Sequence, residues 1–94
     1  MKIPKKLKVG GVNYKVKNVN IISSGSGACG LCDFDRSVIE LLEKHEKQAK
    51  EQTLLHELMH AIFYHCNIEQ DEHTVEILAQ ALYMVIKDNP EMFK

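Results

Sequence analysis

The sequence has no long apolar run. Its uninterrupted apolar stretches span only a few residues, and the opening segment MKIPKKLKV has lysines but neither the apolar segment nor the small-residue cleavage site of a signal peptide. We therefore expect a soluble, cytoplasmic protein with no membrane partner.

Its 94 residues, 45% hydrophobic and 27% charged, suffice for one modest core, so a single domain over residues 1–94 is expected.

The chain has only three cysteines, which is an odd number. Cys29, Cys32 and Cys66 cannot form a closed disulfide framework, which fits a reducing compartment. Cys29 and Cys32 have the C-x-x-C spacing of half a zinc site or a redox pair, and Cys66 and His45 are the remote ligands that such a site could recruit. No second C-x-x-C follows, so we favour small buried hydrophobic residues in or beside a strand.

Acidic residues are absent from the first 32 positions, which hold six lysines, although the whole chain has a net charge of −1. This asymmetry could mark a basic face for an acidic partner or for nucleic acid. The interpretation that we favour is an exposed edge strand whose lysines prevent edge-to-edge aggregation. Because aromatic residues do not interleave with the lysines, no nucleic-acid partner is expected.

Residues 1–42 form a strand-rich part of the sequence. The pair Gly10-Gly11 separates two segments of alternating apolar and polar residues, which predicts a hairpin. A second strand pair is expected to turn at Asp35-Arg36, after a flexible Gly/Ser-rich loop. The expected strands cover residues 6–9, 12–19, 31–34 and 37–41. We therefore expect a small antiparallel sheet.

Helical periodicity begins at about residue 43 and predicts two helices. The first covers about residues 43–66, has solvated first turns that include Glu51, and ends near Asn67, which tolerates the left-handed conformation. Asp71 is expected to cap the second, over about residues 72–88. Its expected buried face consists of Val75, Leu78, Ala79, Leu82, Val85 and Ile86. The expected fold class is α+β, with the sheet followed by two helices.

The first helix carries the segment HELMH within the apolar run TLLHELMHAIFYHC. Residues four apart project from the same side of a helix, so the rings of His56 and His60 can meet one ion. Glu57 lies beside that ion and is placed to accept a proton from an attacking water. This is the H-E-x-x-H pattern, which predicts Zn²⁺ with Glu57 as general base. The alternative is a helix with two half-buried, hydrogen-bonded histidines and a surface glutamate.

A catalytic zinc ion takes three protein ligands, so the second helix has to supply one. We prefer Glu76, because it borders the apolar face beside Val75, where a half-buried acid needs a partner. Glu72 is the alternative third ligand, although acids are common in a first helical turn for dipole reasons alone. His73 is the third candidate. A purely structural zinc ion would need a fourth protein ligand, which helical geometry makes hard to supply.

Three segments, CDFDRSVIEL, QTLLHELMHAIFYH and DEHTVEILAQALYMVIKDNP, resemble the short ImmA/IrrE-like zinc metallopeptidases of phages and prophages. The similarity covers about residues 31–90. It implies a minimal zincin-like domain of the gluzincin type, with His56 and His60 as zinc ligands and Glu57 as general base. It also implies a downstream helical glutamate as third ligand, which we carry to Glu76.

Two functions from different classes are compatible with these patterns. The resemblance implies a zinc-dependent metallopeptidase that cleaves a peptide or protein substrate, such as a repressor-type regulator in a mobile element. An extended substrate could add to the sheet edge by backbone hydrogen bonds. The alternative is a non-catalytic, zinc-binding phage regulatory or interaction protein that docks to a host or phage protein through its lysine-rich hairpin. Neither function determines an oligomeric state.

Overall fold

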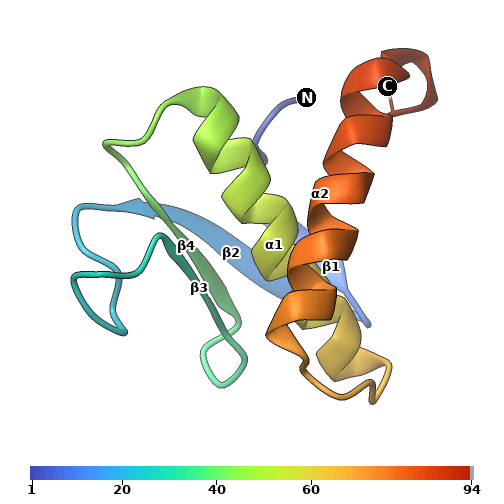
Figure 1. The fold of residues 1–94 in the computed structure, drawn as a ribbon. Helices are drawn as coiled ribbons and strands as arrows, with labels where there is room; N and C mark the ends of the chain where they lie inside the picture. Colours follow the sequence, from blue (N-terminus) through green and yellow to red (C-terminus); the bar gives the residue numbers. More distant parts are fainter. Residues whose placement is uncertain (94) are drawn as a thin grey trace.

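The computed structural model describes residues 1–93 and has a sheet followed by helices (Figure 1). Its elements are β1 (Lys6–Val9), β2 (Val12–Val19), β3 (Gly30–Asp33), β4 (Val38–Leu42), α1 (Lys47–His65), α2 (Glu72–Asp88) and a short 3-10 helix, η1 (Pro90–Phe93). Lys94, which belongs to the expected domain 1–94, lies outside the described residues. The α+β class and the order of sheet before helices are confirmed.

The sheet is mixed, with the strand order β1-β2-β4-β3. The β1–β2 and β3–β4 pairs are antiparallel as expected, but β2 and β4 are parallel, from Lys15 opposite Val38 to Val19 opposite Leu42. The expectation of a wholly antiparallel sheet is therefore wrong at its centre. The physical reason is that every residue of β4 is buried, so β4 inserts between β2 and β3. This insertion leaves β3 at the edge of the sheet.

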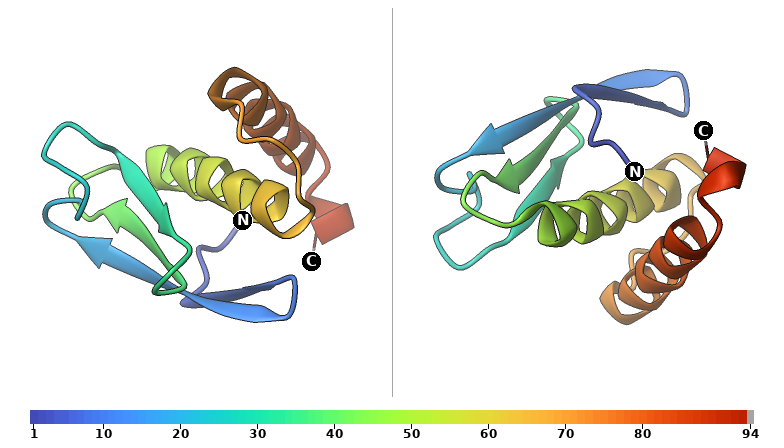
Figure 2. Two further views of the ribbon diagram at one scale, coloured as in Figure 1. Left: turned by 90° about the horizontal axis from the view of Figure 1, so that it is seen from below. Right: turned by 90° about the horizontal axis from the view of Figure 1, so that it is seen from above.

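Helix α1 lies between the sheet and α2 (Figure 2). One of its sides packs on the sheet, where Leu54 and Ala61 join Tyr14, Ile39 and Leu41 in a core cluster. Its other side packs on α2, where Leu55 meets Ala79 and Tyr83. Within the described chain, α2 contacts only α1 and η1 among the elements. No helix in residues 1–93 combines the length and the apolar character that a membrane crossing requires.

The turn between the helices follows from the way α1 ends. Asn67 has a φ of 57°, the left-handed conformation expected for it. The N–H of Ile68 donates to the carbonyl of Phe63 over 2.9 Å, and the N–H of Asn67 donates to that of Tyr64 over 3.3 Å, which is the Schellman pattern. Asp71 then takes the N-cap position of α2. This short connection brings the first turn of α2 back alongside α1.

The exposed side of α2 is more apolar than its sequence pattern suggests. Leu78 and Val85, expected in the buried face, are each 43% exposed, because only one neighbouring helix covers α2. Tyr83 is buried instead and donates its hydroxyl to a carboxylate oxygen of Glu51 over 2.8 Å. Glu51, expected in solvated turns, is 2% exposed. The expectation for Glu51 failed because its partner comes from the other helix.

Candidate metal centre

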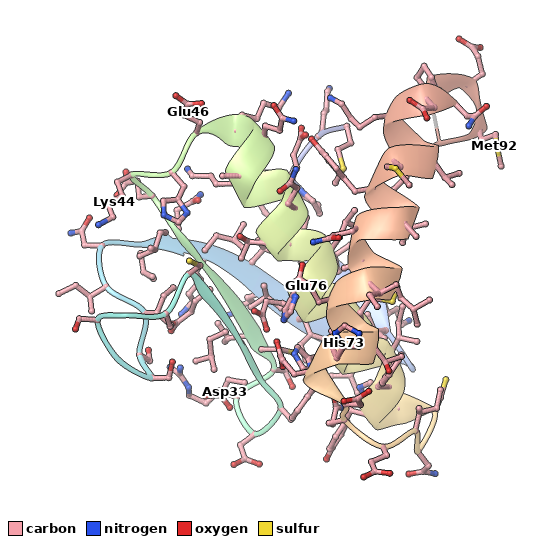
Figure 3. All side chains as sticks on the ribbon, in the orientation of Figure 1. Asp33, Lys44, Glu46, His73, Glu76 and Met92 are labelled. Carbon is pink, nitrogen blue, oxygen red and sulfur yellow. The ribbon has the colours of Figure 1, made fainter. Side chains whose placement is uncertain are left out.

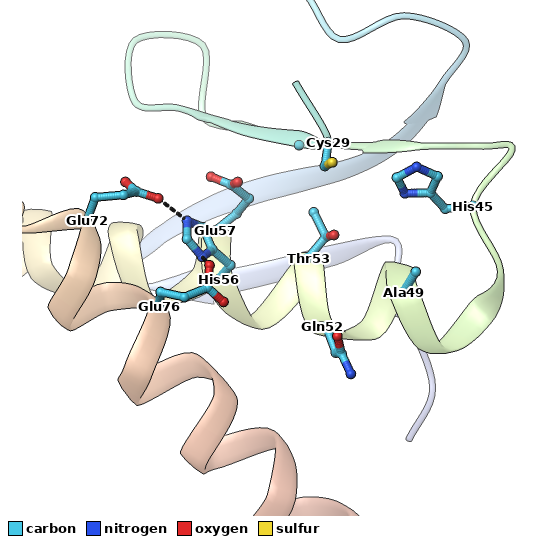
Figure 4. Close-up of a pocket in the computed structure, with 10 residues that line it drawn as sticks. Cys29, His45, Ala49, Gln52, Thr53, His56, Glu57, Glu72 and Glu76 are labelled. Atoms are coloured by element: carbon cyan, nitrogen blue, oxygen red, sulfur yellow. Dashed lines mark ion pairs between the residues drawn. The ribbon is translucent and has the colours of Figure 1, made fainter. Parts of the chain in front are cut away.

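Helix α1 places His56 and Glu57 on the side that faces β3 and the start of α2 (Figure 4), and His60 lines a cavity on the same side. The two imidazole rings lie in a T-shaped arrangement with centroids 4.9 Å apart. Both side chains are mostly covered, with 16% exposed for His56 and 17% for His60. Residues four apart on the helix thus bring two ring nitrogens to one place, as the spacing predicts.

Glu72, in the first turn of α2, joins these two histidines. Its Oε1 lies 2.6 Å from Nε2 of His56, and its Oε2 lies 3.1 Å from Nε2 of His60. Each oxygen of one carboxylate therefore contacts a different imidazole. One ligand atom from each of the three residues lies within 4.8 Å of the others, which makes them a group that could hold a metal ion. We call His56, His60 and Glu72 the metal group.

Glu76, the preferred third ligand, occupies a different position. Its Oε2 lies 3.1 Å from Nδ1 of His56, the ring nitrogen that points away from the metal group. Figure 3 shows Glu76 where the first turns of α2 cross α1. Four residues advance a helix by about 6 Å, so Glu72 and Glu76 reach opposite nitrogens of the same ring. The structure therefore brings Glu72 into the metal group and places Glu76 at the opposite nitrogen of His56. His73 is exposed and is not part of the group.

Glu57 is buried beside the metal group, with 8% of its surface exposed. Burial raises the pKa of its carboxyl group; the charges of His56 and His60 oppose that effect, and those of Glu72 and Glu76 add to it. A carboxylate in such surroundings takes up a proton more readily than one in water. Its position and its proton affinity are both suited to general-base chemistry.

Gly30, the first residue of the edge strand β3, allows this close packing. A Cβ atom at position 30 would collide with the Cγ2 methyl group of Thr53 and would lie 3.2 Å from Oε2 of Glu57. Thr53 is β-branched, so its methyl group cannot easily move aside. The absence of a side chain at Gly30 therefore lets α1 carry Glu57 directly against the sheet edge, which the sequence did not reveal.

Two cavities adjoin at the metal group. The larger, of about 460 Å³, extends past Cys29 and His45 (Figure 4). The smaller, of about 300 Å³, extends past Phe34 and Gln70. Both are lined by Gly30, His56, Glu57 and Glu72. The site thus lies at the middle of a hollow region that borders β3, with space on either side for an extended ligand.

The cysteines take no part in the metal group. All three are free; Cys32 is only half-buried in β3, and Cys29 and Cys66 are exposed, so the expectation of buried cysteines is wrong for Cys29 and Cys66. Burial, followed by the nearby charges of Glu57 and Asp33, raises the pKa of the Cys32 thiol to about 12. Thiol exchange requires the thiolate, so the Cys32 thiol of the metal-free protein is poorly suited to it at neutral pH.

Gln70 is a site residue that the sequence did not reveal. Its side-chain amide contacts both the ring and the backbone carbonyl of His60. No spacing rule points to it, because it lies in the irregular connection between the helices.

Comparison of the chain with protein-family models, with curated proteins and with solved structures gave no match. The fold and the side-chain geometry therefore carry the functional argument.

Proposed function

We propose that the protein is a zinc-dependent metallopeptidase in which His56, His60 and Glu72 hold the zinc ion and Glu57 is the general base. The observation that carries this proposal is the meeting of two Nε2 atoms and one carboxylate beside a buried glutamate. Glu72, the alternative in the sequence analysis, replaces Glu76 as third ligand, because it contacts the Nε2 atoms of both histidines.

The chemistry of the donor atoms supports zinc. Two imidazoles and one carboxylate are a ligand set of known catalytic zinc sites. Donor atoms that share one tetrahedral zinc ion lie about 3.3 Å apart. Nε2 of His60 lies 3.1 Å from Oε2 of Glu72, Nε2 of His56 lies 2.6 Å from Oε1, and one ligand atom from each residue lies within 4.8 Å of the others, so a bound zinc ion would require these side chains to adjust. The Glu72 side chain is 70% exposed, so it is free to make this adjustment.

Within the described residues the metal group offers three ligand residues, the number that a catalytic zinc site takes from the protein. Zinc bound there would supply Lewis acidity, polarising a peptide carbonyl and making a nearby water molecule more acidic. The chain's own contribution is the Glu57 carboxylate, which takes the proton of the attacking water and returns it to the leaving amine. Burial of Glu57 keeps that carboxylate in the low dielectric where its charge acts strongly.

Strand β3 supports a peptide as the substrate. It lies at the edge of the sheet, so an extended peptide can add to it by backbone hydrogen bonds. Gly30 at the start of β3 approaches Glu57 directly, and cavities lie on both sides of that point. A peptide aligned along β3 would therefore present one of its carbonyl groups beside Glu57 and the metal group.

The biological setting is part of the proposal. The resemblance to ImmA/IrrE-like metallopeptidases supports a phage or prophage protein that cleaves a repressor-type regulator. Three free cysteines are compatible with the reducing cytoplasm of a bacterial host. The substrate would then be a cytoplasmic regulatory protein with an accessible extended segment.

The zinc content of the purified protein tests this proposal. The wild type, purified without added metal, is expected to contain about one zinc ion per chain, because three ligands converge on one point. His56→Ala should lose most of that zinc. His73→Ala, which removes an exposed histidine from α2, should retain it and serves as the matched control. A wild-type protein without zinc, even after zinc is added, would overturn the proposal.

A second candidate function, docking to an acidic protein, has its own observation in the β1–β2 hairpin. Lys6 and Lys15 are register partners in the two strands. Lys8 and Lys17 follow at the alternate positions, and all four side chains are exposed. None of the four forms an ion pair within residues 1–93. Because like charges placed opposite each other destabilise a sheet, this lysine face favours an acidic binding partner.

The double variant Lys6→Glu/Lys15→Glu tests the docking function. Binding to an immobilised poly-glutamate peptide at low salt is expected to weaken at least about tenfold, since two favourable contacts become repulsive. Lys44→Glu/Lys50→Glu changes the net charge equally on a different surface and should bind as the wild type does. Equal weakening in both variants would show that net charge, and not the lysine face, governs the binding.

A further inference from the structure

The side chain of Gln70 makes two hydrogen bonds to the same residue, His60. Its Oε1 lies 2.7 Å from Nδ1 of the imidazole, and its Nε2 donates to the backbone carbonyl oxygen of His60 over 3.0 Å. Gln70 also lines the smaller cavity. This pair of contacts ties the connection between the helices to one of the histidines of the metal group.

The contact with the backbone carbonyl determines which atom donates and which accepts in the contact with the ring. A backbone carbonyl oxygen only accepts hydrogen bonds, so the NH₂ group of Gln70 has to face it. The other end of the amide, Oε1, then faces the ring and can likewise only accept. Nδ1 of His60 must therefore carry the proton. In the neutral imidazole the lone pair is then on Nε2, the atom that faces Glu72.

The sequence of the connection explains why Gln70 reaches His60. The Schellman pattern at Asn67 ends α1 and reverses the chain direction. Gln70 then passes beside the penultimate turn of α1, and Glu72 follows two residues later at the start of α2. One short segment thus delivers both the residue that contacts Nδ1 of His60 and the carboxylate that contacts its Nε2.

We propose that Gln70 is a positioning residue that holds His60 as the Nδ1–H tautomer and directs its Nε2 into the metal group. The role of Gln70 toward the metal rests on the proposed function. The hydrogen bond between Gln70 and His60 is independent of that function. Glu76 contacts Nδ1 of His56 in the corresponding way. Each histidine is therefore held at its far nitrogen by a residue from the connection or from α2. Such outer partners commonly change metal affinity by about 10- to 100-fold.

Gln70→Met tests the inference, because methionine keeps the length of the side chain and removes both hydrogen bonds. Zinc affinity, measured by competition with a chelator, is expected to fall about 10- to 100-fold. Gln48→Met, which changes an exposed glutamine on α1, should leave the affinity unchanged. An affinity of Gln70→Met within about twofold of the wild type, in a protein that binds zinc, would overturn the positioning role.

A second measurement separates this inference from the proposed metal centre. The nitrogen chemical shifts of the His60 imidazole, measured by proton–nitrogen NMR, should place the proton on Nδ1 in metal-free wild-type protein, and Gln70→Met should lose this preference. A wild type that binds no zinc but shows this proton would refute the metallopeptidase and leave the tautomer assignment supported. If the wild type carries the His60 proton only on Nε2, the inference about Gln70 is wrong.

Discussion

The Glu57→Gln protein is expected to bind zinc as the wild type does and to hydrolyse peptides about 10²- to 10⁴-fold more slowly, the usual contribution of a general base. Glutamine has nearly the same shape as glutamate, so it fits the buried position against Gly30. It cannot accept the proton of an attacking water. Zinc analysis and turnover of a mixed peptide library, read by mass spectrometry, measure the two properties separately.

Glu43→Gln provides the matched control, because Glu43 is exposed and lies outside the cavities next to the metal group. It should keep both zinc and activity. A Glu57→Gln protein that cleaves at the wild-type rate would rule out the general-base role. If the zinc is lost together with activity, Glu57 is a ligand or a structural residue, and the assignment of the ligand set has to change.

The second large effect is expected at Glu72. Loss of one ligand should weaken zinc binding roughly 10²-fold or more, since structural zinc sites bind with about 10–16 kcal/mol shared among four ligands. Glu72→Ala removes the carboxylate that contacts both Nε2 atoms. Glu76→Ala removes only the contact to Nδ1 of His56, so it should weaken binding less. Chelator competition on both variants measures the difference.

The absorption spectrum of the cobalt-substituted protein distinguishes a ligand from a positioning residue where the affinities overlap. The visible bands of Co²⁺ depend on the number and type of its ligands. Glu76→Ala should retain the wild-type spectrum, because the three ligand atoms remain. Glu72→Ala should change it. The reverse pattern would return the third-ligand role to Glu76, the residue preferred from the sequence.

Local features of the fold were predictable from the sequence because their physical causes are local. Gly10-Gly11 lies between alternating segments, and the structure has the hairpin there, with strands Lys6–Val9 and Val12–Val19. Asn67 ends α1 in the left-handed conformation, and Asp71 is the N-cap of α2. The placement of His56 and His60 on one side follows in the same way from the helical repeat.

Contacts between distant elements were not predictable, and the tertiary structure alone decided them. The turn residues Asp35-Arg36 predicted the hairpin β3–β4 but not that β4 pairs in parallel with β2, because two hairpins can meet in several ways. The burial of Glu51 depends on Tyr83 from the other helix. Periodicity reports which face of an element is apolar; it does not report which residue of a neighbouring element lies opposite.

In the candidate site, too, local features were predictable from the sequence and contacts between distant elements were not. The sequence by itself determined that His56, Glu57 and His60 lie close together on α1, because the helical repeat places residues four apart on the same side. Only the tertiary structure decided that Glu72 meets both Nε2 atoms, that Glu76 contacts the far nitrogen of His56, and that Gln70 contacts His60. Those positions depend on where the turn after Asn67 places α2 against α1, and a shift of one helical turn would exchange the two glutamates.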